Sequence, residues 1–487
     1  MPTGGGATHR PLPHRGFVNC SGPAACSLLI FDDPAEAEAK AEAETKAETE
    51  ETRVATPSDS EAPSAGPFGW PFSWSRIPTA MFGCNTSGPE SRGQMAFNAR
   101  FGITICERDS LCVLVRSLKA AAARALDEAR TMMDLHGYTD TERWLQVQAA
   151  AMKAAPPAEP VFVYRSASGT DAFFRLGAAI VDNSTRRSQW LLHFQPDPST
   201  GRLNCDPHGF GCSDYDFRVA AMRDYYLDQI IPEVAAEPNI DGVFFDDCDT
   251  VVGGARSGAW LSEQERAEIS NASLPVLAEA FRKLNAAGKT PMWSSGRTFS
   301  GIPAQGVTRW SPAAAFPPGR AYSEEAAIEA FAGTRYWRYY EFWMWQAGSA
   351  TCGAQIQNAL REQAAGVPIV AITPSCPKPR HHAGGNGPCG GHVPSSMAEF
   401  FNFSAAAFLV VASDFSYWGF QDSEGGGGGW FDQDKTWHSL YDAALGRPLG
   451  NATAGADGMS WAREFEHASV RVSCATGQGS VQPRPLG

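Results

Sequence analysis

The chain has 487 residues, of which 43% are hydrophobic, and a formal net charge of -13. This length suffices for one large domain, or two to three ordinary ones, with a sizeable core. The negative net charge argues against a nucleic-acid partner, because phosphate binding needs clustered Lys and Arg. The sequence contains no run of about 20 apolar residues, so no membrane span is predicted.

The first 69 residues lack the pattern of a folded domain. Ala, Glu and Lys repeat from Asp33 to Thr52 without an apolar face that folding could bury. A linker rich in Pro, Ser and Ala follows at 58–67. We therefore expect residues 1–69 to form a disordered acidic tail and linker.

From Trp70 onward, short apolar runs alternate with longer amphipathic stretches, which is typical of βα units. Helices are predicted between the strands, for example over 219–231 and 274–284, where apolar residues recur at spacings of three and four. Eight successive units without a GxGxxG or Walker A motif favour a closed (β/α)8 TIM barrel over an open nucleotide-binding sheet. We place the barrel at 70–445 and a small C-terminal β-hairpin appendage and tail at 446–487. The strand candidates are 77–84, 102–107, 161–165, 240–246, 291–295, 336–343, 367–373 and 408–415.

The segment IDGVFFDDCD at 240–249 carries the most unusual chemistry, because an apolar strand runs into three carboxylates. Burying carboxylates costs free energy unless they are paired or used, and the C-terminal strand ends form the active site of a (β/α)8 barrel. Side chains alternate along a strand, so only one of Asp246 and Asp247 can face the barrel mouth. The alternatives are an acidic loop, a helix N-cap, or a set of calcium ligands that includes Asp249.

A second carboxylate, Glu341, lies alone in the aromatic sequence YYEFW. Such a residue faces solvent, pairs with Arg335 or Arg338, or lies in a cleft with a raised pKa. A raised pKa is what a general acid requires near neutral pH, and two carboxyl groups on facing strands are the usual apparatus for cleaving a glycosidic bond. We predict Asp246 as nucleophile or base, Glu341 as general acid and Asp247 as a further catalytic candidate.

Other strand ends supply candidates for substrate contacts, through hydrogen bonds to hydroxyls or stacking on sugar faces. Glu107, Tyr164, Arg165 and Asp414 could equally be ion-pair or cap residues. The His and Cys residues between 376 and 392 show no spacing typical of metal ligands, so no metal and no cofactor is expected. The substrate-binding candidates are Glu107, Tyr164, Arg165, Asp249, Trp293, Trp343 and Asp414.

Several segments, taken in order, resemble one group of proteins: WSRIPTAMF (74–82), FGITICE (101–107), VFVYRS (161–166), DGVFFDD (241–247) and LGRPLG (445–450). Over 70–474 the chain is similar to the hypothetical glycosyl hydrolase type, a TIM-barrel grouping distantly related to α-galactosidase-like enzymes. The resemblance implies a fold and a reaction class, the hydrolysis of O-glycosyl bonds, and no particular substrate. We expect the substrate to be an oligo- or polysaccharide. The resemblance also implies a catalytic carboxylate at Asp246 and a partner acid on the sixth strand, at Glu341. The alternatives are a non-catalytic carbohydrate-binding barrel and a calcium-binding structural protein.

Cysteines and glycosylation sequons favour a secreted or lumenal glycoprotein. The 12 Cys include close pairs at 20/26, 205/212 and 376/389, which fit disulfides better than zinc sites. No signal peptide is evident in this chain, since residues 1–18 lack an apolar stretch. Asn-X-Ser/Thr sequons occur at Asn19, Asn85, Asn183, Asn271, Asn402 and Asn451.

Overall fold

The structure is a computed structural model of the whole chain and divides into two compact units, Met1–Ala62 and Pro63–Gly487. In the first unit, β1 (Phe17–Cys20) pairs antiparallel with β2 (Cys26–Leu29), and the register sets Cys20 opposite Cys26. The structure describes residues 17–20, 26–29, 67–83, 92–106, 141–154, 159–167, 169, 174–192, 214–246, 248, 263–294, 328–340, 343–344, 349–374, 396–421 and 437–484.

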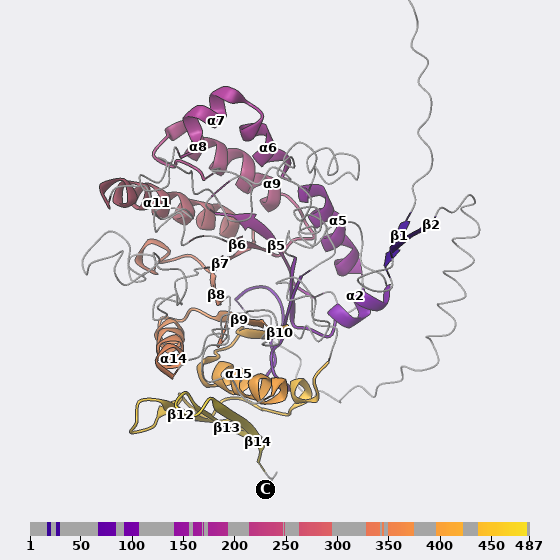
Figure 1. Cartoon of the computed structure of the whole chain (residues 1–487), viewed down its shortest axis with the longest axis vertical. Helices are drawn as coiled ribbons and strands as arrows, with labels where there is room; N and C mark the ends of the chain where they lie inside the picture. The colour runs from indigo at the N-terminus through magenta and orange to yellow at the C-terminus, as the bar shows by residue number, and fades with distance from the viewer. Residues whose placement is uncertain are drawn as a thin grey trace, which may run out of the picture. The chain divides into compact units, whose positions relative to one another are not determined.

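The second unit contains eight parallel strands that form a nearly closed barrel with helices between them (Figure 1). Each strand pairs with the next one along the chain. The ring closes where Thr79 bridges to Trp418, whose backbone N–H donates to the carbonyl of Pro78 at 2.9 Å. This topology confirms the predicted (β/α)8 class. The strands are β3 (Ala80–Phe82), β4 (Ile103–Cys106), β5 (Val161–Ser166), β6 (Gly242–Asp246), β7 (Thr290–Ser294), β8 (Trp337–Tyr340), β9 (Ile369–Pro374) and β10 (Tyr417–Gln421).

Helices cover the outward face of the strands, where alternate strand residues pack against them. Phe245 of β6, for example, lies 5.4 Å from Phe281 between ring centroids. None of the helices in the described ranges is long and apolar enough to cross a membrane. The helices are α2 (Arg92–Asn98), α5 (Thr141–Ala154), α6 (Arg175–Val181), α7 (Ser184–Trp190), α8 (Ala220–Tyr225), η2 (Tyr226–Ile230), α9 (Ile231–Ala235), α11 (Glu263–Ala286), α14 (Ser349–Ala364), α15 (Met397–Val411) and η5 (Ser439–Asp442).

The eighth strand lies later in the chain than the sequence predicts. The predicted strand 408–415 overlaps the last turn of α15, a helix whose N-terminus is capped by the side chain of Ser396. From Phe400 onward every residue of α15 except Asn402 is buried, so the helix lacks the polar face by which periodicity detects a helix. The true strand, β10, contains Gly419, where a Cβ atom would lie 2.4 Å from the carbonyl oxygen of Ala80 across the closing seam.

Aromatic side chains fill the interior of the barrel in layers. In the layer nearer the N-terminal ends of the strands, which we call the lower layer, Phe162 stacks on Trp337 with ring centroids 4.8 Å apart. In the middle layer Phe244 lies 4.5 Å from Tyr339 and 5.8 Å from Phe82. Both layers are buried, so the interior is a packed core rather than a pore.

The segment 67–74 covers the N-terminal end of the strands. Phe68 lies 5.2 Å from Trp337, and Trp70 meets the same ring edge-on at 5.6 Å. Phe72 lies 5.8 Å from Tyr417, the first residue of β10. This end of the barrel is therefore closed by aromatic rings.

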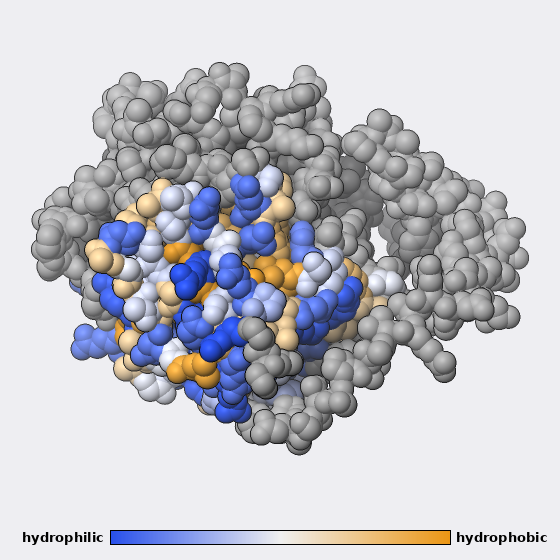
Figure 2. All heavy atoms as spheres, turned by 90° about the horizontal axis from the view of Figure 1, so that it is seen from below, coloured by the Kyte–Doolittle hydropathy of each residue, from blue (hydrophilic) through white to orange (hydrophobic). Residues whose placement is uncertain are grey.

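The C-terminal residues form an antiparallel sheet ordered β11 (Thr453–Ala454), β12 (Ser460–Glu464), β13 (Ala468–Ser473) and β14 (Gln478–Pro483). This confirms the predicted C-terminal β appendage and gives it four strands. In β13 the side chains alternate between buried and more exposed, as expected for a sheet with one covered face. The sheet packs on α15, and the coloured residues on this side are mainly hydrophilic, with small hydrophobic areas between them (Figure 2).

Candidate active site

The C-terminal end of β6 brings Asp246 to the mouth of the barrel. The register pairs Asp246 with Ser166 of β5 and Phe244 with Met292 of β7. Because Phe244 points into the interior, Asp246 two residues later points to the same side. Its side chain is half-buried, whereas the four residues before it are buried. Asp246 thus lies where the packed interior opens.

Hydroxyl groups on neighbouring strands share the inward face with Asp246. Ser166, 8% exposed, ends β5, and the buried Ser294 ends β7. Tyr339 of β8 pairs with Ser294 in the parallel register. Asp246 and the two serines form a polar row above the aromatic layer that contains Tyr339, and hydroxyls beside a carboxylate can donate hydrogen bonds to it or to a sugar.

Ser166, Ser294, Tyr339 and Asp214 are not among the residues predicted from the sequence. Asp214 is buried and lies beside the end of β5 through an antiparallel bridge to Gly169. A usable signal for Ser166 and Ser294 was their position two residues after an inward residue, Tyr164 in β5 and Met292 in β7. Asp214 had no such signal, because a long connection brings it there.

Tyr164 is the predicted substrate-binding residue that the structure places in the interior. It is fully buried, two residues before Ser166, and its ring lies 6.0 Å from Phe244. The ring of Phe174, next to α6, lies at the same distance on another side. Tyr164 therefore packs directly below the polar row.

Three other candidates lie in the outer layer, between strands and helices, and the structure does not bring them to the mouth. Arg165 forms an ion pair of 2.7 Å with Glu233 of α9. The indole of Trp293 is covered by the guanidinium of Arg338 at 4.0 Å. The indole N–H of Trp343 donates to a backbone carbonyl of α15 at 3.2 Å. Alternation along the strands explains why Arg165 and Trp293 point outward.

Asp414 lies at the opposite end of the barrel from Asp246, because β10 begins after it rather than ending near it. Its carboxylate accepts a hydrogen bond of 2.7 Å from the indole N–H of Trp74. Burial lowers the pKa of Arg463 to about 10, and the negative charge of Asp414 opposes this shift. Asp414 therefore belongs to the closed end.

Glu107, Asp247, Asp249 and Glu341 lie outside the described residues. In the ranges that the structure describes, no group of three or more His, Cys, Asp and Glu is placed to hold a metal ion. The thiol of Cys248 is buried and donates to the carbonyl of Phe245 at 3.4 Å, which ties the residues after β6 back to that strand.

The fold and the site define a (β/α)8 barrel with an acidic residue at the C-terminal end of its fourth strand. Residues 153–469 match the sequence profile described as hypothetical glycosyl hydrolase family 15, and the chain belongs to this family. The match spans more than half of the chain and confirms the resemblance found in the sequence. No curated protein matches the chain.

Solved structures of carbohydrate-related proteins are similar to this chain at low identity. Ega3 of Aspergillus fumigatus in complex with galactosamine is 10% identical, with a TM-score of 0.30, over 71% of this chain and 88% of that chain. Endo-glycoceramidase II from Rhodococcus sp. is 11% identical, with a TM-score of 0.38, over 87% and 96%. An α-amylase from Geobacillus thermoleovorans with acarbose is 8% identical, with a TM-score of 0.35, over 68% of each. Sequence identities and TM-scores this low indicate no substrate for this chain.

Proposed function

We propose that the protein is a glycoside hydrolase that cleaves O-glycosyl bonds in an oligo- or polysaccharide with two carboxyl groups at the barrel mouth. Asp246 acts as nucleophile or base, and Glu341 acts as general acid. The observation that carries this proposal is the placement of Asp246, an acidic side chain that ends a buried strand on the inward face, between hydroxyl groups. Membership in a glycosyl hydrolase family supports the reaction class.

The directions of the neighbouring side chains support the proposed role of Glu341. Tyr340 packs against Trp343, with ring centroids 5.3 Å apart, and its hydroxyl donates to Glu362 of α14 at 3.0 Å, so it points outward. Trp337 and Tyr339 instead contact the inward rings of Phe162 and Phe244. Since side chains alternate, we expect the residue after Tyr340 to face the interior.

The register sets the expected separation of the two acids. Asp246 is level with Ser294 and Tyr339, and a regular continuation of β8 would put Glu341 two strands away and one inward position higher. A strand spacing of about 4.8 Å and a rise of about 3.3 Å per residue put the two Cα atoms roughly 12 Å apart. Two inward side chains shorten this gap toward the separation of about 5–9.5 Å between carboxyl groups that glycosidases use.

In the proposed reaction Glu341 donates its proton to the leaving glycosidic oxygen as the bond to the anomeric carbon breaks. Asp246 either attacks that carbon or removes a proton from an attacking water. Ser166 and Ser294 flank Asp246 and can hold its carboxylate, or a substrate hydroxyl, in place by hydrogen bonding. No metal or cofactor takes part in this scheme.

The test is hydrolysis of a panel of aryl glycosides and polysaccharides by the wild type and by Asp246→Asn and Glu341→Gln. We expect each substitution to lower kcat about 10²–10⁴-fold while the circular dichroism spectrum stays unchanged. Asp414→Asn is the matched control, because it neutralises an acid at the other end of the barrel. Unchanged turnover in Asp246→Asn would refute the assignment. Glycan binding that survives both substitutions, without hydrolysis by the wild type, would indicate a binding barrel.

We further propose that the protein is secreted or lumenal. A disulfide joins Cys352 and Cys474, and Cys106 is also disulfide-bonded. Structural disulfides persist mainly in oxidising compartments. Expression with a secretory leader in a eukaryotic host should give soluble protein with these cysteines oxidised, measured by thiol titration. Fully reduced cysteines in that material would contradict the proposed location.

A further inference from the structure

The face of the C-terminal sheet that points away from α15 is polar. In β13 the buried residues Ala468, Val470 and Val472 face the helix, so the residues between them face outward. Directly paired residues of an antiparallel sheet point to the same side, and the register therefore places outward side chains of all four strands beside one another. Six polar residues of this outward face are Thr453, Ser460, Arg471, Ser473, Gln478 and Ser480.

The same six residues line an open hollow of about 950 Å³. Ligand-binding sites usually have volumes of about 300–1,000 Å³, so the hollow has room for several sugar units. Glu399 and Asn402, both exposed at the start of α15, also contribute to its lining. Among the described lining residues none belongs to a barrel strand, so the hollow is separate from the barrel mouth at Asp246.

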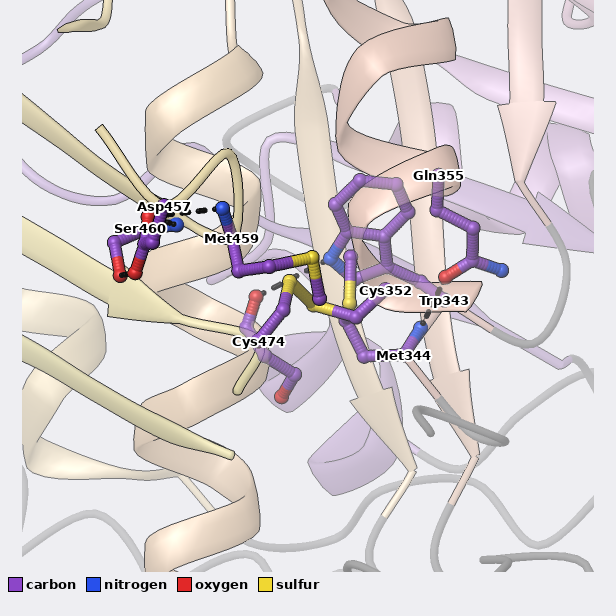
Figure 3. Close-up of a disulfide and its surroundings, with 9 residues drawn as sticks. Trp343, Met344, Cys352, Gln355, Asp457, Met459, Ser460 and Cys474 are labelled. Carbon is purple, nitrogen blue, oxygen red and sulfur yellow. Dashed lines mark hydrogen bonds between the residues drawn. A yellow bond between two sulfur atoms is a disulfide. The ribbon is translucent and has the colours of Figure 1, made fainter. Parts of the chain in front are cut away.

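The end of the sheet where Ser460 lies is fixed by two sets of bonds (Figure 3). The carboxylate of Asp457 accepts hydrogen bonds from the backbone N–H groups of Met459 and Ser460 at 2.9 and 3.0 Å, and from the hydroxyl of Ser460 at 2.8 Å. These bonds lower the pKa of Asp457, so its carboxylate stays charged and keeps them at neutral pH. Cys474, after β13, is bonded to Cys352 of α14. A wall that is ordered before a ligand binds loses less conformational entropy on binding.

Arg471 supplies the hollow with a positive charge. Its side chain is exposed, and within the described part of the chain it forms no ion pair and no hydrogen bond. By contrast, Arg484 pairs with Glu464 at 3.3 Å, and Arg463, on the covered face, donates to the backbone carbonyl of Leu409 at 3.1 Å. The planar guanidinium of Arg471 is therefore available to bind a carboxylate through two parallel hydrogen bonds.

The hollow has no exposed aromatic ring on which a neutral sugar could stack. Among the described residues that line it, Trp461 is the only aromatic one, and it is 4% exposed. Recognition there depends on charge and hydrogen bonds. Hydroxyls and the amide of Gln478 can donate to and accept from sugar hydroxyls, and Glu399, the only described carboxylate of the lining, can accept from them. A uronic acid sugar presents both groups that this surface can bind, a carboxylate and several hydroxyls.

We propose that the hollow is a second carbohydrate-binding site, specific for glycans that contain uronic acids. Arg471 binds a uronate carboxylate, and Ser473, Gln478 and Ser480 bind hydroxyls of the same or neighbouring sugars. The inference goes beyond the proposed hydrolysis, because binding at this site needs no reaction at Asp246. An acidic polymer held here stays attached to the protein while other parts of it reach the barrel mouth.

The test is titration calorimetry with a hexamer of galacturonic acid, using the full-length Asp246→Asn protein so that the hexamer is not cleaved. We expect Arg471→Gln in this background to raise Kd about 10- to 100-fold, because it removes a charge-assisted pair. Arg447→Gln is the matched control, since Arg447 is also exposed but does not line the hollow. It should change Kd by no more than about twofold at roughly 0.15 M salt, where charges that do not touch the ligand are screened.

The fully methyl-esterified hexamer tests the acidic class, because it keeps the sugar rings and lacks the charge. It should bind at least about tenfold more weakly than the acid. Equal binding of the two hexamers would overturn the assignment of an acidic ligand. Equal loss of affinity in Arg471→Gln and Arg447→Gln would also overturn the site, because it would indicate general attraction to surface arginines. Failure of the acid hexamer to bind with a Kd in the millimolar range or below would do the same.

Hydrogen exchange locates the bound hexamer. Amides of 453–462 and 471–480 should exchange more slowly with the ligand present, while those of β6 stay unchanged. Protection of β6 and not of the sheet would place the hexamer at the barrel mouth and overturn the inference. The two proposals fail separately: unchanged turnover in Asp246→Asn would refute the hydrolase assignment, whereas unchanged affinity in Arg471→Gln would refute only the second site.

Discussion

The two ends of the barrel use their side chains in different ways. At the N-terminal end, aromatic rings close the interior and charged groups are paired, as in the 2.7 Å contact between Lys153 and Asp241. At the C-terminal end, a polar row stands above the packed layers, with the half-buried Asp246 in it. The contrast fits the division typical of this architecture, in which one end of the barrel stabilises the fold and the other carries the site.

The strongest test of this contrast is Trp337→Ala in the lower layer. Trp337 is fully buried and packs on Phe162, Phe68 and Trp70. We expect the free energy of unfolding to fall by about 3–5 kcal/mol, because a large cavity replaces the indole. Urea unfolding followed by circular dichroism measures it, with Leu449→Ala, at a position 59% exposed, as the control. A fall in the free energy of unfolding as small as that of the control would mean that the N-terminal end of the barrel does not stabilise the fold.

A second test uses the pH dependence of the closed end. Burial raises the pKa of Glu159 to about 7, although the charges of Arg76 and Lys153 oppose the shift. Between about pH 4.5 and 7 the folded state therefore holds a proton that the unfolded state has lost, so stability falls as pH rises through this window.

Glu159→Gln should remove this loss and raise the free energy of unfolding at pH 8 by about 1–3 kcal/mol, with little effect at pH 4. Urea unfolding of both proteins at the two pH values measures the difference. The exposed Glu464 provides a control in Glu464→Gln, which should show no such gain. A wild-type stability that rises from pH 5 to 7, and keeps rising in the same way in Glu159→Gln, would contradict the sign.

The smallest expected effects concern two sequons away from the mouth. Asn402 and Asn451 are both exposed, but the hydroxyl of Ser404 in the first sequon is buried and donates to Phe400, whereas Thr453 in the second is exposed. When protein that was produced and folded in bacteria is treated with oligosaccharyltransferase, Asn451 should therefore be modified and Asn402 should not. Mass spectrometry of the glycopeptides measures the modification. Asn→Gln at either site should change stability by no more than about 0.5 kcal/mol and leave turnover unchanged. Equal modification of both sites would contradict this reasoning.

Much of the fold follows from local patterns in the sequence. Seven of the predicted strands overlap β3 to β9, because buried parallel strands are short apolar runs between amphipathic helices. The eighth differs because a helix buried on nearly all sides has no periodic polar face, so the apolar run at 408–411 resembles a strand. The glycine in β10 also weakens its strand signal, yet the closing seam needs it.

The site is less predictable, because it depends on which way each side chain points. For Asp246 the direction follows from alternation along a strand whose limits were predicted well. Arg165 and Trp293 also lie on strands with well-predicted limits, but their side chains point outward. Asp414 lies at the N-terminal end of the barrel, not the C-terminal end, because the eighth strand begins a few residues later than predicted. The hydrogen bond of 3.1 Å from the backbone N–H of Met344 to the side chain of Gln355 in α14 has no local signal in the sequence, since it depends on how a helix packs beside a strand end.

The seam between Thr79 and Trp418 has a consequence for synthesis of the protein. The first strand of the ring leaves the ribosome long before its last neighbour exists. At about 5–20 residues per second, the wait is roughly 20–70 s. During that time the outer edge of β3 can pair with other chains, and Cys352 also waits for Cys474, which follows it by 122 residues. Chaperones that shield nascent strand edges should therefore raise the yield of folded enzyme more than they raise its final stability.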